Sequence, residues 1–534
     1  MEYMIREKSL ENKGKRFKIY SMLWNNVAIL FLVLLFVGFP LFFRDKYYDI
    51  AYYKWIYYVF IIIFLIFTVF LFSVFETLLR VKKAKYLKLD YIIILYGFAS
   101  LASYISSQSQ MAAFMGTDGW YMGMVAQVFF ILSYLIFCKR YIKAEIIIAL
   151  SSIGSFCCCI IGIFQRYGFD FLHLYWEMPA EVVRDYISTI GNRTWFSSYI
   201  CAVCPVGIYL FWKAKNLKNL LGWGFYIFTI FSCLVTTNSD SVYVSIFAVF
   251  FILFILSIGN GRSMLHFCYL LAIWFCSCLI MALLRIPFAN QVRELRGISA
   301  LFLNIKLALI GALFSICLAY LVKKKNQFID SINRCKCQKL IIIIALSLMC
   351  SLILLIILNT SGVLNKCFGV TIHNKYLFFD DSWGDYRGST WSLTLRMFRE
   401  LPLINKFFGV GPDCFAFYAY SNQEYTRYLN SIWGEAVLAN AHNEWLNSIF
   451  CLGLIGGIIY ISIFISVVIS CLKKEDDNST HPIIPAIGLC VVGYMTHNFF
   501  CYQQVSATGI IFVLMGIASG QQKMLINEKT TICG

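Results

Sequence analysis

Long, almost unbroken apolar runs recur along the whole chain and set the strongest limit on its fold. A helix that crosses a bilayer needs roughly 20 mostly apolar residues. Several runs are too long for barrel strands, and backbone polar groups in lipid must be satisfied within their own segment. We therefore expect an all-α, polytopic membrane protein with about 12 to 14 transmembrane helices. The runs begin near Trp24, Trp55, Tyr91, Tyr121, Ala144, Trp195, Leu221, Val242, Met264, Ala300, Leu340, Trp445, Ile483 and Ser506.

The amount and distribution of charge narrow the class of protein further. Of the 534 residues, 60% are hydrophobic and only 14% are charged, whereas roughly 25% is usual for soluble domains. The formal net charge of +17 is spread over short segments between the apolar runs. A continuous basic face, typical of nucleic-acid-binding proteins, is missing from this pattern. We expect membrane lipid, and no nucleic acid, among its partners.

Clusters of basic residues predict the orientation of the chain. The positive-inside rule places them in the cytoplasm together with the basic N-terminus, which runs into the first span like a signal anchor. Lys306 alone falls inside a predicted span, about two turns from its start near Ala300, and is expected to extend toward the interface. The clusters are Lys13–Lys18, Arg80–Lys88, Lys139–Lys143 and Lys323–Lys339.

The cysteine and carboxylate patterns do not indicate a metal site. Most of the 21 cysteines lie within apolar runs, where they behave as small buried hydrophobes. The pair Cys335 and Cys337 lacks a second pair at zinc spacing. Asp380, Asp381 and Asp385 are typical of a solvated loop, since no further ligands stand near them. We expect no metal and no cofactor.

One connection between spans is far longer than the others and falls on the predicted external side. It runs from about residue 359 to residue 444, and loops of this length are usually functional. A helical piece is expected from Trp391 to Glu400. The chain thus divides into N-terminal transmembrane helices (1–189), central transmembrane helices (190–358), a large external loop (359–444) and C-terminal transmembrane helices (445–534).

A histidine stands where this loop enters the next apolar run. His442 and Asn443 precede Gly453, Gly456 and Gly457. At 3.6 residues per turn, His442 and Gly453 would share one face of a continuous helix. Such a strip without side chains lets a second helix or a lipid chain approach closely. On helix geometry alone, an ordinary interfacial histidine above a helix-packing motif explains the pattern too.

The spacing of these residues resembles a known family. His442-Asn443, nine residues, then Gly453-x-x-Gly456 is similar to the signature of the O-antigen ligase family. That family also contains O-antigen polymerases and related membrane oligosaccharide transferases. The resemblance implies a GT-C-like arrangement of helices and covers about residues 190–520.

Two further stretches carry the same resemblance. Arg387, with Trp391 four residues on and then Gly409-Val-Gly411, resembles the large external loop of the family. Weaker matches are Gly191-Asn192-Arg193 at the start of a span and His497-Asn498 near the C-terminus. His497 itself is more typical of a hydrogen-bonded core histidine.

The resemblance implies a glycan donor on undecaprenyl diphosphate, a sugar hydroxyl as acceptor, and no metal. Negative charge then grows on the leaving diphosphate, and fixed cations stabilise it. Arg387 is the first candidate and Arg193, at a helix start, the second. His442 is the candidate base, because imidazole titrates near neutral pH and nearby arginines favour its neutral form. Candidate substrate-binding residues are Arg193, Asn443, Trp391, Gly409, Gly411, Gly453 and Gly456.

Two classes of function remain open. The first is a metal-independent glycosyltransferase of cell-surface polysaccharide biosynthesis, acting as a ligase or as a polymerase. The alternative is a transporter that flips lipid-linked oligosaccharides, which the number of spans would suit. Many transporters show a repeat that relates their two halves, and this sequence shows none. We expect a multi-pass enzyme of the bacterial plasma membrane whose long loop faces outside and binds the lipid-linked glycan and a glycan or lipid acceptor.

Overall fold

The structure is a computed structural model that describes residues 19–79, 86–119, 121–292, 294–374, 376–473, 475 and 481–532. Within these ranges the chain is almost entirely helical, and twelve helices are long and apolar enough to cross a membrane. Two shorter apolar helices are α6 (Met124–Phe137) and α24 (Ile483–His497). The expected all-α, polytopic fold is therefore confirmed, and each predicted apolar run contains one of these fourteen helices.

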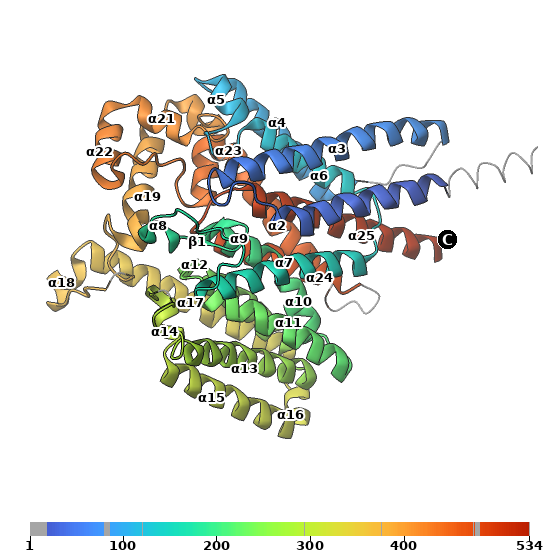
Figure 1. The fold of residues 1–534 in the computed structure, drawn as a ribbon, viewed down its shortest axis with the longest axis vertical. Helices are drawn as coiled ribbons and strands as arrows, with labels where there is room; N and C mark the ends of the chain where they lie inside the picture. Colours follow the sequence, from blue (N-terminus) through green and yellow to red (C-terminus); the bar gives the residue numbers. More distant parts are fainter. Residues whose placement is uncertain are drawn as a thin grey trace, which may run out of the picture.

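Of the twelve long helices, all but α17 run side by side through the body of the molecule (Figure 1). Several contain a bend, so that one span holds two labelled elements. The spans are Ile19–Leu41 (with η1, Leu34–Gly38, and α2, Phe39–Leu41), α3 (Ile50–Leu79), α4 (Lys88–Ser106), α7 (Ala144–Arg166), Arg193–Trp212 (α9, Arg193–Val203, and α10, Pro205–Trp212), α11 (Leu217–Val235), α12 (Asp240–Ser257), α13 (Gly261–Leu284), α15 (Ile305–Lys324), α17 (Arg334–Thr360), α23 (Glu444–Leu472) and Val505–Ile526 (η2, Val505–Gly509, continuing into α25, Ile510–Ile532).

Short elements connect the spans and build the long loop. The two strands β1 (Tyr186–Ile187) and β2 (Gly191–Asn192) pair antiparallel ahead of α9. The short helices are α5 (Gln110–Met115), α8 (Ala180–Val183), α14 (Gly297–Phe302), α16 (Asn326–Asp330), α18 (Val363–Phe368), α19 (Trp383–Glu400), α20 (Leu403–Phe408), α21 (Phe415–Ser421) and α22 (Gln423–Trp433).

The predicted span near Ala300 starts later than the sequence suggested. The helix breaks after α14, and Asn304 caps α15 by accepting hydrogen bonds from the backbone N–H groups of Lys306 (3.1 Å) and Leu307 (3.2 Å). Asparagine at this position satisfies N–H groups that have no partner inside the helix. Lys306 is consequently the second residue of α15 and is exposed. Its predicted place two turns inside a span is wrong.

The helix α24 lies at the centre of the bundle. It packs against α9, α10, α12, α23 and α25, and most of its residues are completely buried. A helix that is hydrophobic all round is typical of such a position. The loop that follows α24, residues 498–504, therefore emerges from the middle of the bundle.

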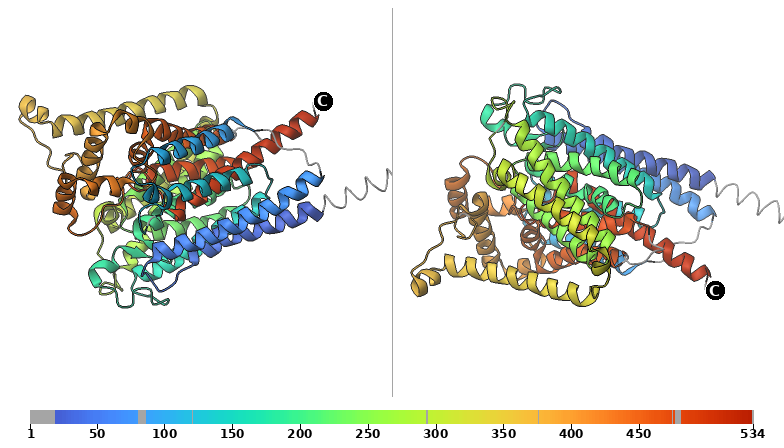
Figure 2. Two further views of the ribbon diagram at one scale, coloured as in Figure 1. Left: turned by 90° about the horizontal axis from the view of Figure 1, so that it is seen from above. Right: turned by 90° about the horizontal axis from the view of Figure 1, so that it is seen from below.

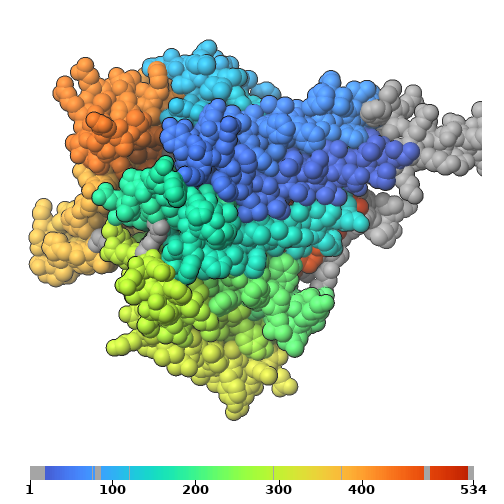
Figure 3. Space-filling model, in the orientation of Figure 1, coloured from blue at the N-terminus to red at the C-terminus, as the bar shows by residue number. Residues whose placement is uncertain are grey.

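The long loop folds over one end of this bundle, and the C-terminal helix points away from the other end (Figures 1 and 3). In Figure 3 the loop helices, drawn in orange, cover the left end beside the light-blue segment of α4 and α5. Side chains of this loop, among them Leu393, Met397 and Phe415, form a second hydrophobic cluster together with Ala113 of α5 and Phe450 of α23. We refer below to this side of the bundle as the loop end.

The helix α17 stands apart from the rest of the bundle (Figure 2). Not one residue in its apolar window is buried. At one end Gln338 donates a hydrogen bond to the Ile255 carbonyl (2.8 Å), and at the other the amide of Asn359 donates to the carbonyls of Ile372 (3.0 Å) and Leu377 (2.9 Å). The helix is thus held by hydrogen bonds at its two ends, and its apolar middle is not buried by the rest of the protein.

Candidate functional site

His442 lies in the short segment between α22 and α23 at the loop end. Its backbone is left-handed (φ 48°), which is uncommon for a residue other than glycine. The side chain of Asn440 accepts a hydrogen bond from the His442 N–H (3.0 Å). Asn443 then caps α23 by accepting from the N–H groups of Trp445 (3.1 Å) and Leu446 (3.0 Å). Asn443 thus stabilises the start of α23, and the turn before it sets the direction of the His442 side chain.

The expectation that His442 and Gly453 share a helix face is wrong. His442 precedes the helix, and Gly453 interrupts α23 with φ 72° and ψ 176°. The break frees the Cys451 carbonyl, which accepts hydrogen bonds from the Ser103 hydroxyl (2.7 Å) and the Gly411 N–H (3.0 Å). An uninterrupted apolar run in the sequence conceals such a break.

The glycines of the two motifs meet at this break. A Cβ on Gly453 would lie 2.2 Å from the Phe407 carbonyl oxygen, and a Cβ on Gly409 (φ 80°) would lie 2.1 Å from that of Cys451. Gly411 (φ 117°) would place a Cβ 2.5 Å from Ser107. Glycine is required because backbone approaches backbone with positive φ. Gly456 lies on the helix beyond the break, where a Cβ would be 2.7 Å from Leu452. This packing explains the glycines without a ligand.

Two aromatic rings enclose the His442 imidazole. Tyr502 stacks on it (ring centroids 5.5 Å apart, 24° between planes), and Trp433 meets it edge-on (5.8 Å, 83°). The indole of Trp195 holds the Tyr502 hydroxyl by donating a hydrogen bond of 2.7 Å. Among the described residues, the His442 ring nitrogens have no hydrogen-bond partner, so they are free to bind a substrate.

Arg387 follows a break in α19 at residues 384–386, whose φ angles are all positive. Its guanidinium donates to the carbonyls of Gly384 (2.5 Å) and Phe500 (2.9 Å) and lies 6.0 Å from the centroid of the Phe500 ring. Its buried Nε has no partner within the described part of the chain. Trp391, one turn later, stacks on Phe500 (6.1 Å, 23°). The Nε–H of Arg387 therefore remains available, and the Trp391 and Phe500 rings lie beside this guanidinium.

Arg193 begins α9 directly after the β1–β2 pair. Its Nε is 3.4 Å from an Asp185 carboxylate oxygen, and its backbone N–H donates to the Asp185 carbonyl (2.7 Å). Its side chain is about a quarter exposed (24%), so an anion can still reach the guanidinium. The charge of Arg193 is close enough to Arg387 to lower the pKa of that guanidinium, after the larger effect of burial. The two predicted cations therefore lie in one region.

The electrostatics of the site keep His442 uncharged. Burial, and secondly the positive charge of Arg387, lower the pKa of His442 to about 3. A cation beside an imidazole disfavours its protonated form. At neutral pH the ring is therefore neutral and can accept a proton.

The loop of residues 498–504 joins the predicted residues, and the sequence reasoning missed it. Phe500 contacts Arg387 and Trp391, whereas Tyr502 contacts His442. The signal in the sequence was His497-Asn498 just before this loop. His497 is, as predicted, a hydrogen-bonded core residue, 3.0 Å from the Ser241 hydroxyl and 3.1 Å from the Asn498 amide oxygen.

Glu444 anchors this loop from inside the bundle. Its buried carboxylate accepts hydrogen bonds from the Tyr460 hydroxyl (2.6 Å), the Tyr494 hydroxyl (2.8 Å) and the Asn498 amide (2.5 Å). A carboxylate in the first turn of a helix is also favoured by the helix dipole. Glu444 could not be selected from the sequence, because its partners lie 16 to 54 residues away.

The three aspartates of the loop do not converge. Asp380 accepts from Ser382, Asp381 accepts from the Tyr428 hydroxyl (3.2 Å), and Asp385 lies in the break ahead of Arg387. In the described ranges no group of three metal-ligating side chains is found.

Comparison with known proteins adds one match. Residues 295–461 match the family described as O-Antigen ligase. The matched segment includes the long loop, His442 and the first half of α23. No curated protein matches the chain.

Proposed function

We propose that this chain, whose residues 295–461 carry an O-antigen ligase domain, transfers or polymerises a glycan from an undecaprenyl-diphosphate donor in polysaccharide biosynthesis. The acceptor is a sugar hydroxyl at the external face of a bacterial plasma membrane. The observation that carries this proposal is the neutral, unpaired imidazole of His442 in the same region as the Arg387 and Arg193 guanidinium groups.

The leaving group in this reaction is the lipid diphosphate. As the bond between the sugar anomeric carbon and the phosphate oxygen breaks, the electron pair stays on that oxygen. Arg387, through its unpaired Nε, and Arg193 stabilise the charge that develops there. Preorganised cations act on the transition state more than on the ground state. No metal is required for this step, since the guanidinium groups supply the positive charge.

His442 takes the proton of the acceptor hydroxyl as its oxygen bonds to the anomeric carbon. A base with a pKa of about 3 is weak, because the best catalytic pKa lies near the working pH. A bound diphosphate neutralises the charge of Arg387, which removes one cause of the low value. We therefore expect donor binding to strengthen His442 as a base.

The remaining predicted residues support the substrate less directly. Trp391 offers an aromatic wall beside Arg387, and Asn443 fixes the turn that carries His442. Gly409 and Gly453 allow the close backbone crossing below the site, and Gly411 and Gly456 allow close side-chain packing beside it. We propose that the acceptor or the donor sugars lie over these glycines. Ligase and polymerase remain two forms of this proposal, because both use the same donor.

Replacement of His442 by alanine in cells tests the proposal. We expect surface polysaccharide to fall by about 100-fold or more, since general base catalysis contributes this much. Undecaprenyl-linked units should accumulate on the outer face while the amount of protein stays normal. The matched control is His373→Ala, because His373 is an exposed histidine of the same loop.

Two results would contradict the enzyme. Accumulation of the lipid-linked units on the cytoplasmic face would favour the transporter. Unchanged polysaccharide in His442→Ala would remove the base from the mechanism. Supplying the purified protein with single repeat units and with finished glycan then separates polymerase from ligase.

A further inference from the structure

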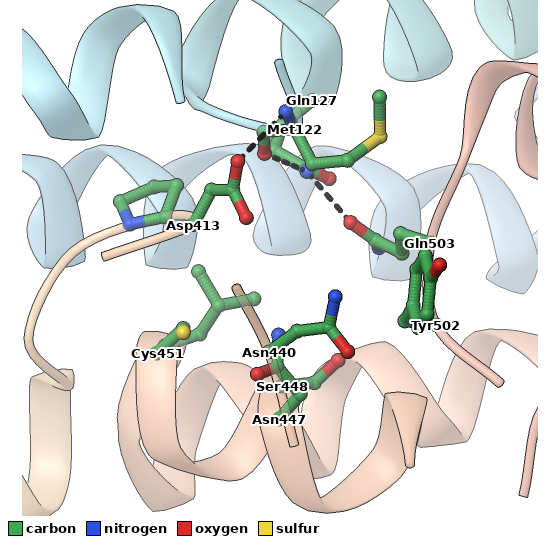
Figure 4. A pocket seen from close by; sticks show the side chains of 11 residues that line it. Met122, Gln127, Asp413, Asn440, Asn447, Ser448, Cys451, Tyr502 and Gln503 are labelled. Atoms are coloured by element: carbon green, nitrogen blue, oxygen red, sulfur yellow. Dashed lines mark hydrogen bonds between the residues drawn. The ribbon is translucent and has the colours of Figure 1, made fainter. Parts of the chain in front are cut away.

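A small pocket lies next to His442 and is lined by polar side chains (Figure 4). It is formed by the segment before α6, the loop after α20, the first turns of α23 and the loop after α24. Asp413 stands on one side of it, Asn440 and Asn447 on the opposite side, and Tyr502 and Gln503 close a third side.

This pocket shares two walls with the candidate base. The Asn440 side chain accepts the hydrogen bond of the His442 N–H, and the Tyr502 ring stacks on the imidazole. A molecule held in the pocket would therefore lie beside His442.

One side of the pocket offers a hydrogen-bond acceptor. Asp413 uses only one carboxylate oxygen, Oδ2, to accept from the N–H groups of Thr117 (2.8 Å) and Met122 (3.0 Å). Its Oδ1 has no hydrogen-bond partner among the residues that the structure describes. Burial also raises the pKa of Asp413 to about 7. No lysine or arginine lines this described pocket, so the carboxylate would repel a diphosphate and suits a neutral ligand.

The opposite side offers hydrogen-bond donors. Asn440 and Asn447 both use their amide oxygens to fix the backbone around His442, on the N–H groups of His442 (3.0 Å) and Ala441 (3.1 Å). Within the described ranges their NH₂ groups have no partner. Each NH₂ carries two donors, so donors face a carboxylate acceptor across the pocket. Sugar hydroxyls, which both donate and accept, match this arrangement.

We propose that the pocket, which has room for about one water molecule, receives one hydroxyl group of the acceptor sugar, to which Asp413 offers a hydrogen-bond acceptor and Asn440 and Asn447 offer donors. The inference rests on the proposed function of His442 as the base. The sugar held here presents a further hydroxyl to His442, while the diphosphate binds on the side of Arg387. Asp413 is then a substrate-binding residue that selects the acceptor.

The substitution Asp413→Asn separates this role from a structural one. Its amide oxygen can still accept from Thr117 and Met122, so the loop remains in place, whereas the carboxylate is lost from the pocket. The control is Asp118→Asn, because Asp118 is an exposed aspartate in the neighbouring segment between α5 and α6 and bonds only to Gly119 and Tyr121 among the described residues. A second variant, Asn440→Asp, keeps the acceptor for His442 and removes a donor from the pocket.

Binding is measured by ligand-observed NMR with the purified full-length protein. The probe is a mixture of short oligosaccharides released from the host envelope with mild acid and freed of phosphate. We expect Asp413→Asn to bind at least about tenfold more weakly, as for the loss of a hydrogen bond to a charged group, and Asn440→Asp to bind about fivefold more weakly, as for the loss of a bond from a neutral donor. Asp118→Asn should bind like the wild type.

Two outcomes would overturn the subsite. One is that the wild-type protein does not bind the oligosaccharides at millimolar concentration. The other is that Asp413→Asn, eluting as a folded protein in size-exclusion chromatography, binds them with unchanged affinity. If Asp413→Asn does not fold, the affinity of Asn440→Asp decides in the same way. Because binding is measured without transfer, these results are separate from a failure of the His442→Ala test in cells.

Discussion

The protonation of His442 connects the site to the stability of the protein. Its pKa is about 3 in the folded protein and about 6.5 in an unfolded chain. A group whose pKa is lowered by folding stabilises the protein above the unfolded value, and this stabilisation is lost as the pH falls from 6.5 toward 3. At pH 5 the loss amounts to roughly 2 kcal/mol.

This predicts a difference between the wild type and His442→Gln. Between pH 7 and pH 5 the melting temperature of the wild type should fall more steeply than that of His442→Gln. Only the wild type has an imidazole at this position that gains a proton when the protein unfolds. Thermal unfolding in detergent at both pH values measures the effect. Equal slopes for the two proteins would show that His442 titrates as it does in water.

At Arg387 the shape of the side chain is expected to matter as much as its charge. The guanidinium spans two carbonyls and still leaves Nε free, whereas a lysine ammonium is a single point of charge. We predict that Arg387→Lys lowers transfer at least about tenfold. Arg427→Lys, an exposed arginine of the same loop, serves as control. In vitro transfer assays measure both, and full activity of Arg387→Lys would argue against a contact through Nε.

At the scale of elements, the break in α23 is the feature that builds the site. Gly453 has φ 72°, and an added Cβ would strike the Phe407 carbonyl at 2.2 Å. We predict that Gly453→Ala destabilises the protein by roughly 2–4 kcal/mol, because both strain and overlap must be relieved. The control is Gly222→Ala inside α11, where an added Cβ meets nothing within 4 Å. Fluorescence-detected size-exclusion chromatography after heating compares them.

The spans were predictable from sequence, whereas their interruptions were not. An apolar run of about 20 residues in lipid forms a helix, because its backbone polar groups must bond within the segment. Gly453 lies in such a run, where a glycine usually indicates close packing between helices. Only the structure shows that the Phe407 carbonyl approaches its backbone. Asn304 was a detectable cap, but the apolar residues before it extended the predicted span to Ala300.

Only some residues of the candidate site were predictable from the sequence. Spacing and resemblance selected His442, Arg387 and Arg193, and the structure brings them near one loop. Tyr502 and Asp413 were missed, because contacts between segments that are distant along the chain, such as Tyr502 with His442 and Asp413 with Thr117, leave no periodic signal in one sequence.

At the scale of the whole molecule, the opposed ends of the bundle allow a test of orientation. Cys367 in α18 is exposed at the loop end, and Cys335 at the start of α17 is exposed at the other. If the loop faces outside, a membrane-impermeant maleimide should label Cys367 in intact cells and Cys335 only after lysis. The variants Cys367→Ser and Cys335→Ser identify each signal. Labelling of Cys335 in intact cells would invert the topology and place His442 in the cytoplasm.

The isolation of α17 has a consequence for how this segment tolerates change. No residue of its apolar window is buried in the protein, so we expect the middle of this helix to depend on hydrophobicity and length rather than on the shape of its side chains. A run of leucines in place of residues 341–358 should leave folding and transfer intact. In α24, where nearly every side chain packs against a neighbouring helix, replacement by leucines should prevent folding.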